Sequence, residues 1–167
     1  MVKAERHNGV IIEVRPEAFG EEARVALVRD PSGAGFTLYE GPEINPQITG
    51  LGTVQRRYHH LPDIDLIAPF YRDLFGWSFE RRANTPWQVY DILDLKGALV
   101  AQAEEVPEAI RGKFRYWMPC FIVSSAENFS ASLAGRGGAV LSELPEGRVL
   151  VADRQGAHFM ICEAGLE

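Results

Sequence analysis

Alternating apolar and polar positions predict β-strands along most of this chain, and helical spacing appears in only two places. Near the amino terminus three strand-like runs are separated by turn-rich segments, at residues 9–15 (GVIIEVR), 22–29 (EARVALVR) and 35–40 (GFTLYE). A stretch dense in Pro and Gly then follows and has no periodicity. We therefore expect a partial module of three strands over residues 1–41 and a linker over residues 42–52.

Beyond the linker the pattern changes to a strand followed by a helix. Residues 53–61 (TVQRRYHHL) alternate, and residues 63–76 carry apolar side chains at helical spacing before Gly76 ends the run. Pro69 limits how early that helix begins, because proline is tolerated only near a helix start. Three more strands are predicted at residues 77–82, 87–95 and 97–103, with Lys96-Gly97 as a hairpin tip.

The same order then repeats. Residues 113–124 read as a long strand, and Ser125 can cap a helix that ends at Gly135. Three further strands are predicted at residues 137–143, 147–153 and 157–163. The region from residue 53 onward therefore has the element order βαβββ twice, which predicts an α+β fold. Residues 9–40 match only the last three strands of that order.

An internal repeat supports this reading. The segment from Asp30 to Glu40, DPSGAGFTLYE, recurs from Asp153 to Glu163 as DRQGAHFMICE, with Asp, Gly, Ala, Phe and Glu in register. Asp opens a turn through its side chain, and Gly supplies the backbone freedom that a short reversal needs. Each copy is thus predicted to form a strand, a tight turn and a strand.

Composition narrows the possible partners and location. The 167 residues are 46% hydrophobic, enough for one well-buried domain with an appendage, and a net charge of −6 with scattered Lys and Arg argues against nucleic acid. No apolar run approaches the roughly 20 residues of a membrane span, and the amino terminus lacks the apolar core of a signal peptide. We therefore expect no membrane partner and a cytoplasmic location.

Several motifs resemble the vicinal oxygen chelate superfamily, which includes glyoxalase I, bleomycin-resistance proteins and extradiol dioxygenases. They are FYRDLFGW after a strand, the pair Gly137-Gly138 after the second helix, and the ending DRQGAHFMICE, and their order is similar to that of the tandem glyoxalase-like branch. The resemblance implies that residues 53–167 form one complete glyoxalase-like domain of paired βαβββ modules, whose curved mixed sheets make a cup for a ligand. Residues 1–41 resemble the tail of a preceding domain. We expect these strands to pack on the complete domain or to pair with a second subunit, and the protein to be a homodimer.

The resemblance also implies four metal-ligand positions, which hold His, Gln or Glu in metal-dependent members. Here they fall on Arg56, Met118, Met160 and either Ala101 or Gln102. An arginine and two thioethers cannot hold a divalent ion that needs imidazole and carboxylate donors. We therefore expect no metal and no other cofactor, with a divalent metal as the alternative.

Two adjacent histidines qualify that expectation. Neighbouring side chains on a strand point to opposite faces, so at most one of His59 and His60 can look into the cup. If Arg56 faces the cup, Tyr58 and His60 share its side. We interpret His60 as a ligand-contacting or surface residue rather than a metal ligand. Glu104, Glu105 and Glu108 are expected to form a solvated acidic patch between the modules.

The candidate ligand-binding residues are the inward positions of the two long first strands: Arg56, Tyr58, His60, Tyr116, Met118 and Cys120. They could close around a planar or an anionic small molecule, with Arg56 as a forked donor and the aromatic rings as stacking faces, or they could be plain core. No catalytic residue is assigned. The protein is expected to bind a small organic molecule, as bleomycin-resistance proteins do. The alternatives are a metal-dependent lyase, isomerase or dioxygenase, and a metal-free enzyme that uses Arg56, Tyr58 and His60.

Overall fold

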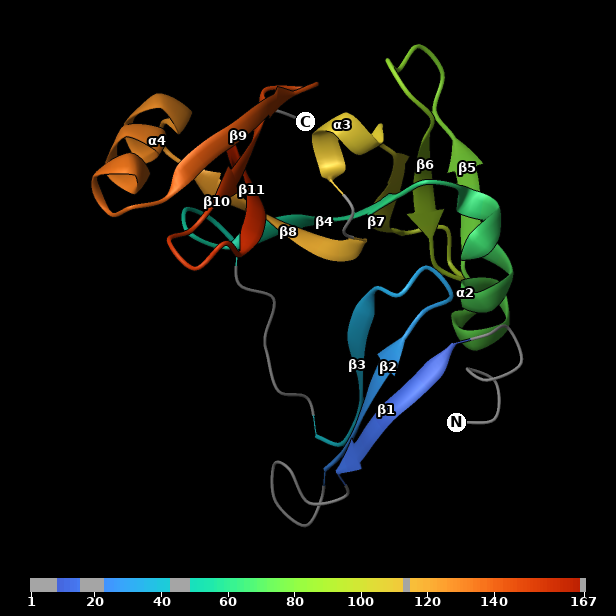
Figure 1. Ribbon diagram of the computed structural model, residues 1–167. Helices are drawn as coiled ribbons and strands as arrows, with labels where there is room; N and C mark the ends of the chain where they lie inside the picture. The colour runs from blue at the N-terminus through green and yellow to red at the C-terminus, as the bar shows by residue number, and fades with distance from the viewer. Residues whose placement is uncertain (1–8, 16–22, 43–48, 113–114, 166–167) are drawn as a thin grey trace. The chain divides into compact units, whose positions relative to one another are not determined.

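The computed structural model describes residues 9–15, 23–42, 49–112 and 115–165 (Figure 1). Its contacts divide the chain into two compact units: a first unit of Met1–Pro46 with His59–Trp117, and a second unit of Gln47–Tyr58 with Met118–Glu167. Residues 43–48 of the predicted linker, and residues 113–114 at the start of a predicted strand, lie outside the described residues. The division into a partial module, a linker and a complete domain remains a prediction.

In the first unit the three amino-terminal strands form a sheet of their own, in the order β1-β2-β3. The predicted strands are confirmed, as β1 (Val10–Arg15), β2 (Arg24–Arg29) and β3 (Gly35–Glu40), and both neighbouring pairs are antiparallel. Val28 of β2 is buried in the same core as helix α2 (Ala68–Phe75). The ring of Phe36 on β3 also lies 6.1 Å from that of Phe70 in α2. The three-strand sheet therefore packs its apolar face on a helix of the same unit.

The other sheet of the first unit has the order β5-β6-β7-β4. Its strands are β4 (Val54–Leu61), which the two units share, β5 (Ser78–Arg81), β6 (Val89–Leu93) and β7 (Leu99–Glu105). The predicted helix over residues 63–76 divides into a 3-10 turn, η1 (Ile64–Leu66), and α2. Pro69 in the first turn of α2 explains the break, and Gly76 ends the helix with φ 72°. A short helix that the sequence did not predict, α3 (Glu108–Arg111), follows β7.

The second unit carries the order β4-β8-β11-β10-β9. Its elements are β8 (Tyr116–Val123), α4 (Ala126–Gly135), β9 (Ala139–Leu144), β10 (Arg148–Ala152) and β11 (His158–Glu163). β11 pairs parallel with β8, and β10 pairs antiparallel with both β9 and β11. Val123, Val151 and Ile161 form a buried cluster in this unit, and Phe129 and Leu133 of α4 pack on it. Each βαβββ run thus places its last strand beside its first, which confirms the α+β class.

Both ends of α4 lie where the sequence predicts them. Ser125 caps the helix, and its Oγ accepts the Asn128 N–H at 3.2 Å. The helix ends at Gly135, as predicted, and Gly135 is its last helical residue. The left-handed position falls two residues later, on Gly137 at φ 83°.

The predicted repeat appears as identical turns, and a third copy joins them. In each turn the Asp carboxylate accepts the backbone N–H groups two and four residues further on, and the Gly takes a positive φ. These Asp-x-x-Gly-Ala turns begin at Asp30, Asp94 and Asp153. In the described part of the chain no helix is long and apolar enough to cross a membrane.

Candidate functional site

The six predicted site residues fall into both units. Arg56 and Tyr58 on β4 and Met118 and Cys120 on β8 belong to the second unit, whereas His60 and Tyr116 belong to the first. Their expected role in lining a single cup remains a prediction, and each group has its own surroundings within its unit.

In the second unit, Tyr58 is covered by an arginine that sequence reasoning missed. The guanidinium carbon of Arg148, on β10, lies 4.5 Å from the centroid of the Tyr58 ring, and both residues are buried, at 4% and 2% exposure. Arg148 Nε donates to the Pro145 carbonyl at 3.0 Å, and Nη1 lies 3.9 Å from Met160 Sδ. The only sequence signal was an arginine opening an apolar strand, and Arg24 occupies the matching place in the partial module with its side chain 74% exposed.

Strand register places the sulfur-bearing residues beside this arginine. Leu150 on β10 pairs with Met160 on β11, and Met160 pairs with Cys120 on β8. Their strand neighbours Val151 and Ile161 form the core beneath α4. Because successive side chains on a strand point to opposite faces, Leu150, Met160 and Cys120 face away from the helix. The cluster of Arg56, Tyr58, Cys120, Arg148 and Met160 is named the arginine cluster below.

The electrostatics of the arginine cluster argue against a reactive thiol. Burial raises the pKa of Cys120, the nearby Cys162 raises it further, and the charges of Arg148 and Arg56 only partly oppose them. Burial also raises the pKa of Tyr58, again against both guanidinium groups. Because a thiol with a raised pKa stays protonated near neutral pH, Cys120 is a poor nucleophile.

In the first unit, His60 meets a carboxylate that sequence reasoning placed in solvent. His60 Nε2 lies 3.3 Å from Glu104 Oε2, and the two side chains are 1% and 0% exposed. The expected solvated patch is therefore wrong for Glu104, and His60 is not a surface residue. The reason is the alternation of β7: Ala101 and Ala103 face the core that contains α2, which turns Gln102 and Glu104 to the other side.

On the same face of β7 as Glu104, Gln102 takes part in a hydrogen-bond network with Asp91 and Arg82. Gln102 Nε2 donates to Asp91 Oδ1 at 2.7 Å, and Arg82 Nε donates to Asp91 Oδ2 at 3.0 Å. Asp91 and Gln102 stand directly opposite each other on β6 and β7. The carboxylate of Asp91 thus joins an amide and a guanidinium in one network.

His59 has a different set of partners in the first unit. Its Nε2 lies 2.6 Å from Asp30 Oδ2, which also accepts the Tyr71 hydroxyl at 3.0 Å, while Trp117 Nε1 donates to that hydroxyl at 2.8 Å. Burial alone would raise the pKa of Asp30, but the hydrogen bond and charge of His59, the Ser32 hydroxyl and the Ala34 N–H lower it. His59 and Asp30 are fully enclosed, so this network anchors the turn rather than meeting a ligand.

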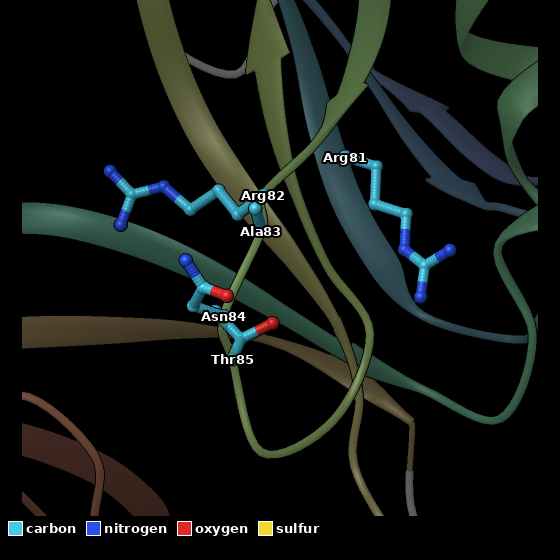
Figure 2. Close-up of a pocket in the computed structure, with 5 residues that line it drawn as sticks. All are labelled: Arg81, Arg82, Ala83, Asn84 and Thr85. Atoms are coloured by element: carbon cyan, nitrogen blue, oxygen red, sulfur yellow. The ribbon is translucent and has the colours of Figure 1, made fainter.

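A hollow of about 270 Å³ lies in the loop between β5 and β6, and five consecutive residues from Arg81 to Thr85 line it. The side chains of Arg81 and Arg82 point to different sides (Figure 2). Arg82 is already engaged by Asp91. Because no other strand or helix contributes, this hollow is a feature of the loop rather than a convergent site.

Comparison with known proteins identifies the fold. No protein-family model matches the sequence, and no curated protein matches it. Solved structures do match: a glutamate-to-glutamine mutant of glyoxalase I from Zea mays has a TM-score of 0.56, at 12% identity over 96% of this chain and 62% of that chain. A putative dioxygenase from Bacillus subtilis has a TM-score of 0.59, at 8% identity over 95% of this chain and 57% of that one. The chain has the vicinal oxygen chelate fold.

A third similar structure is BphC, a halotolerant catechol dioxygenase, with a TM-score of 0.54, at 12% identity over 98% of this chain and 61% of that chain. The chain thus spans about three fifths of the length of these proteins. At such identities the likeness concerns the fold alone.

The metal positions of the vicinal oxygen chelate fold can now be compared with the residues that occupy them. Met118 and Met160 are buried, Ala101 belongs to the core, Gln102 is bonded to Asp91, and Arg56 is half-buried. A divalent ion needs imidazole, carboxylate or thiolate donors, which this set lacks, and Arg148 adds a positive charge beside Met160. These residues do not fit the metal. Among the described residues no three His, Cys, Asp or Glu side chains form a group that could hold one.

Proposed function

We propose that this chain binds a small organic molecule and does so without a catalytic metal. The observation that carries the proposal is that the expected metal-ligand positions hold Arg56 and two buried thioethers, Met118 and Met160, with the Arg148 guanidinium beside Met160. A guanidinium stays charged at any physiological pH, and it repels a cation as strongly as it attracts an anion. The binding role of bleomycin-resistance proteins, which the sequence resembles, agrees with such a site.

The surroundings of these two arginines also favour binding over covalent chemistry. The thiol of Cys120 has a raised pKa, and burial raises the pKa of the Tyr58 hydroxyl. Neither group ionises readily near neutral pH, so neither is prepared to act as a nucleophile or a general base. What the cluster offers is fixed positive charge and soft apolar surface.

The second candidate is a metal-dependent lyase, isomerase or dioxygenase, and one observation favours it. His60 and Glu104 bring an imidazole nitrogen and a carboxylate oxygen within 3.3 Å of each other in a buried setting, and both are good ligands for divalent ions. Similar structures include proteins described as a glyoxalase I and as dioxygenases. Two donors are fewer than such a site requires, so this candidate comes second.

Metal content separates the two candidates. The protein is purified without a histidine tag, and bound metal is measured by elemental analysis before and after soaking with Zn, Ni, Mn and Fe(II). We expect no ion to be retained. About one tightly held ion per one or two chains would contradict the proposal and make His60 a ligand. A ligand screen by saturation-transfer NMR on the same sample then tests small-molecule binding directly.

We also propose that the protein is a cytoplasmic homodimer. The support for a dimer is the three-strand sheet. Among the described strands β3 pairs only with β2, so its other edge is open to pairing with a second subunit. Light scattering on the full chain tests this, and a monomeric mass over a range of concentrations would contradict it.

A further inference from the structure

The two complete βαβββ runs share a contact between a glutamate and the start of a helix. β7 ends at Glu105, whose Oε1 accepts the N–H of Ile64, the first residue of η1, at 2.9 Å. β11 ends at Glu163, whose Oε1 accepts the N–H of Ala126, the first residue of α4, at 2.8 Å. The first N–H groups of a helix have no partner inside it, and a carboxylate there also meets the positive end of the helix dipole. In both runs the last strand therefore fixes the start of the helix that follows the first strand.

The last strand of the three-strand sheet also ends in a glutamate, but its second edge has no neighbour among the described strands. β3 ends at Glu40, which is the counterpart of Glu163 in the repeat of DPSGAGFTLYE and DRQGAHFMICE. β11 has β8 beside it as a parallel partner, whereas β3 pairs only with β2 in the described part of the chain. The side chain of Glu40 is 81% exposed and meets Arg24, itself 74% exposed, at 3.8 Å. Glu40 therefore stands where the other two runs place a helix cap.

Burial along the two matching strands differs in the way that a missing neighbour predicts. Leu38 on β3 corresponds to Ile161 on β11 in the repeat. Ile161 pairs with Phe121 of β8 and has 0% exposure. Leu38 packs on the core that contains α2 but is only half-buried. A further strand beside β3 would extend this apolar face and cover more of Leu38.

The chain itself shows which kind of segment fits such an edge. By the example of β8 and α4, it is a strand parallel to β3 that leads directly into a helix, with the first helical N–H at Glu40. A second copy of this chain carries two such strands, β4 and β8, but each of them already has a strand on both sides. Two copies that joined through β3 across a two-fold axis would pair antiparallel, and that contact brings no helix start to Glu40.

We propose that the free edge of β3 is a docking site for a strand–helix segment of another polypeptide, and that Glu40 caps the helix of that segment. The strand would add to the sheet by main-chain hydrogen bonds and place apolar side chains beside Leu38 on the face that packs on α2. The charge of Glu40 complements the positive start of the incoming helix. This inference goes beyond small-molecule binding and does not depend on it. A homodimer that used β3 would hold this edge only until the segment displaced the second copy.

A peptide of residues 115–136 is the probe, because it contains β8 and α4, which occupy the matching edge of β11. It is added to the full chain under reducing conditions, and hydrogen exchange of the backbone is followed by mass spectrometry. We expect a 1:1 complex with a Kd of about 100 μM or tighter, and slower exchange at residues 35–40. Exchange at residues 158–163 should not change, because β8 already covers β11. A scrambled peptide of the same composition is the control.

Variants of the chain and of the peptide test the role of Glu40. Glu40→Gln removes the charge and should lower peptide affinity by about threefold to tenfold. Arg24→Gln is the matched control, because it breaks the same exposed ion pair but leaves the carboxylate, so affinity should not fall. A peptide with Ala126→Pro lacks the N–H that Glu163 accepts, and proline is well tolerated at the first helical position. Glu40→Gln should have no effect on the affinity of that peptide.

Three outcomes would overturn the inference. The first is unchanged exchange at residues 35–40 with the peptide at millimolar concentration, or equal slowing by the scrambled peptide. The second is an equal effect of Glu40→Gln on both peptides, which would remove the helix cap from the site. The third is a dimer whose residues 35–40 stay protected when the peptide is added, which would make a second copy the occupant. The metal-free binding function is tested separately, by metal content and by the ligand screen.

Discussion

The carboxylate of Asp30 and the imidazole of His59 lie 2.6 Å apart, and neither side chain has any exposure to solvent. They come from different parts of the first unit, since Asp30 opens the turn between β2 and β3 and His59 lies on β4. The Tyr71 hydroxyl on α2 donates to the same carboxylate oxygen. One turn of the amino-terminal sheet is thereby tied to a strand and a helix of the same unit by charge-assisted hydrogen bonds.

Replacing Asp30 by Asn should destabilise the protein far more than the same change in an equivalent turn. Asn cannot carry the charge that His59 and Tyr71 face, and breaking a buried pair costs about 3 kcal/mol or more. Asp153→Asn is the matched control, because Asp153 makes the same turn contacts at an exposed position. The free energy of unfolding from urea titrations measures both. Equal losses in the two variants would show that the turn contacts alone account for the effect.

The same carboxylate predicts how stability depends on acid. The folded-state pKa of Asp30 lies below its ordinary value of 3.8, so the unfolded chain takes up the proton first as pH falls. The contribution of Asp30 is therefore complete above that ordinary value and is lost as pH falls through the lower folded value. Urea titrations between pH 3 and 7 should show the gap between wild type and Asp30→Asn closing only at the acid end. A gap that is constant over this range would contradict the assignment.

Removing the hydroxyl of Tyr71 tests its hydrogen bond to the Asp30 carboxylate. Tyr71→Phe deletes the donor to Asp30 and the acceptor of the Trp117 N–H, and we expect a loss of about 1 to 3 kcal/mol. Tyr90→Phe is the control, because its hydroxyl donates to the exposed Gln88 side chain at the surface. Combining Tyr71→Phe with Asp30→Asn should cost less than the sum of the single losses, since both act on one carboxylate. Strict additivity would show that the two groups are not coupled.

Local chemistry explains which parts of the fold were predictable. Strand alternation, the caps at Ser125 and Gly76, and the Asp-x-x-Gly-Ala turns depend on neighbouring residues, and they appear where the sequence indicates. The apolar spacing over residues 63–76 is continuous, and Pro69 indicated only a limit on how early the helix begins. Only the backbone consequence of Pro69 separates the 3-10 turn from α2.

The partners of the charged residues were not predictable in the same way. Nothing in the DPSGA turn distinguishes Asp30 from Asp153, because the difference is a histidine 29 residues away that packs on one turn only. Glu104 stands in an acidic run of the kind that is usually exposed to solvent. Strand alternation on β7 instead turns its side chain to the buried face, beside His60. Arg148 looks like Arg24, and nothing in its neighbouring residues indicates that it lies beside Met160 of β11 and the Tyr58 ring of β4.

The burial of Glu104 gives a fourth prediction. Glu104→Ala removes a buried carboxylate beside His60, and the loss should approach about 3 kcal/mol because the histidine is left in an apolar setting. Glu108→Ala is the control, since Glu108 lies exposed at the start of α3 and its removal should have little effect. Thermal unfolding of both variants checks the difference. If Glu104→Ala is as stable as Glu108→Ala, the acidic patch is solvated as the sequence suggested.

Two glycines near the ends of secondary structure should respond to alanine with opposite signs. Gly135 is the last residue of α4, has ordinary helical backbone angles, and a Cβ there would meet nothing within 4 Å. Gly135→Ala should therefore stabilise the protein, by up to about 1 kcal/mol, because alanine is the better helix former. Gly156 also has open space around it but sits at φ 85° in the Asp153 turn.

Alanine at Gly156 should instead destabilise by about 1 to 2 kcal/mol, because the left-handed backbone is strained for a residue with a Cβ even where nothing touches it. Since neither substitution creates a clash, the sign of each effect reports the backbone angle alone. Urea titration of the two variants side by side is the measurement. A loss at Gly135 would indicate that its backbone is left-handed rather than helical, which would contradict its place as the last residue of α4.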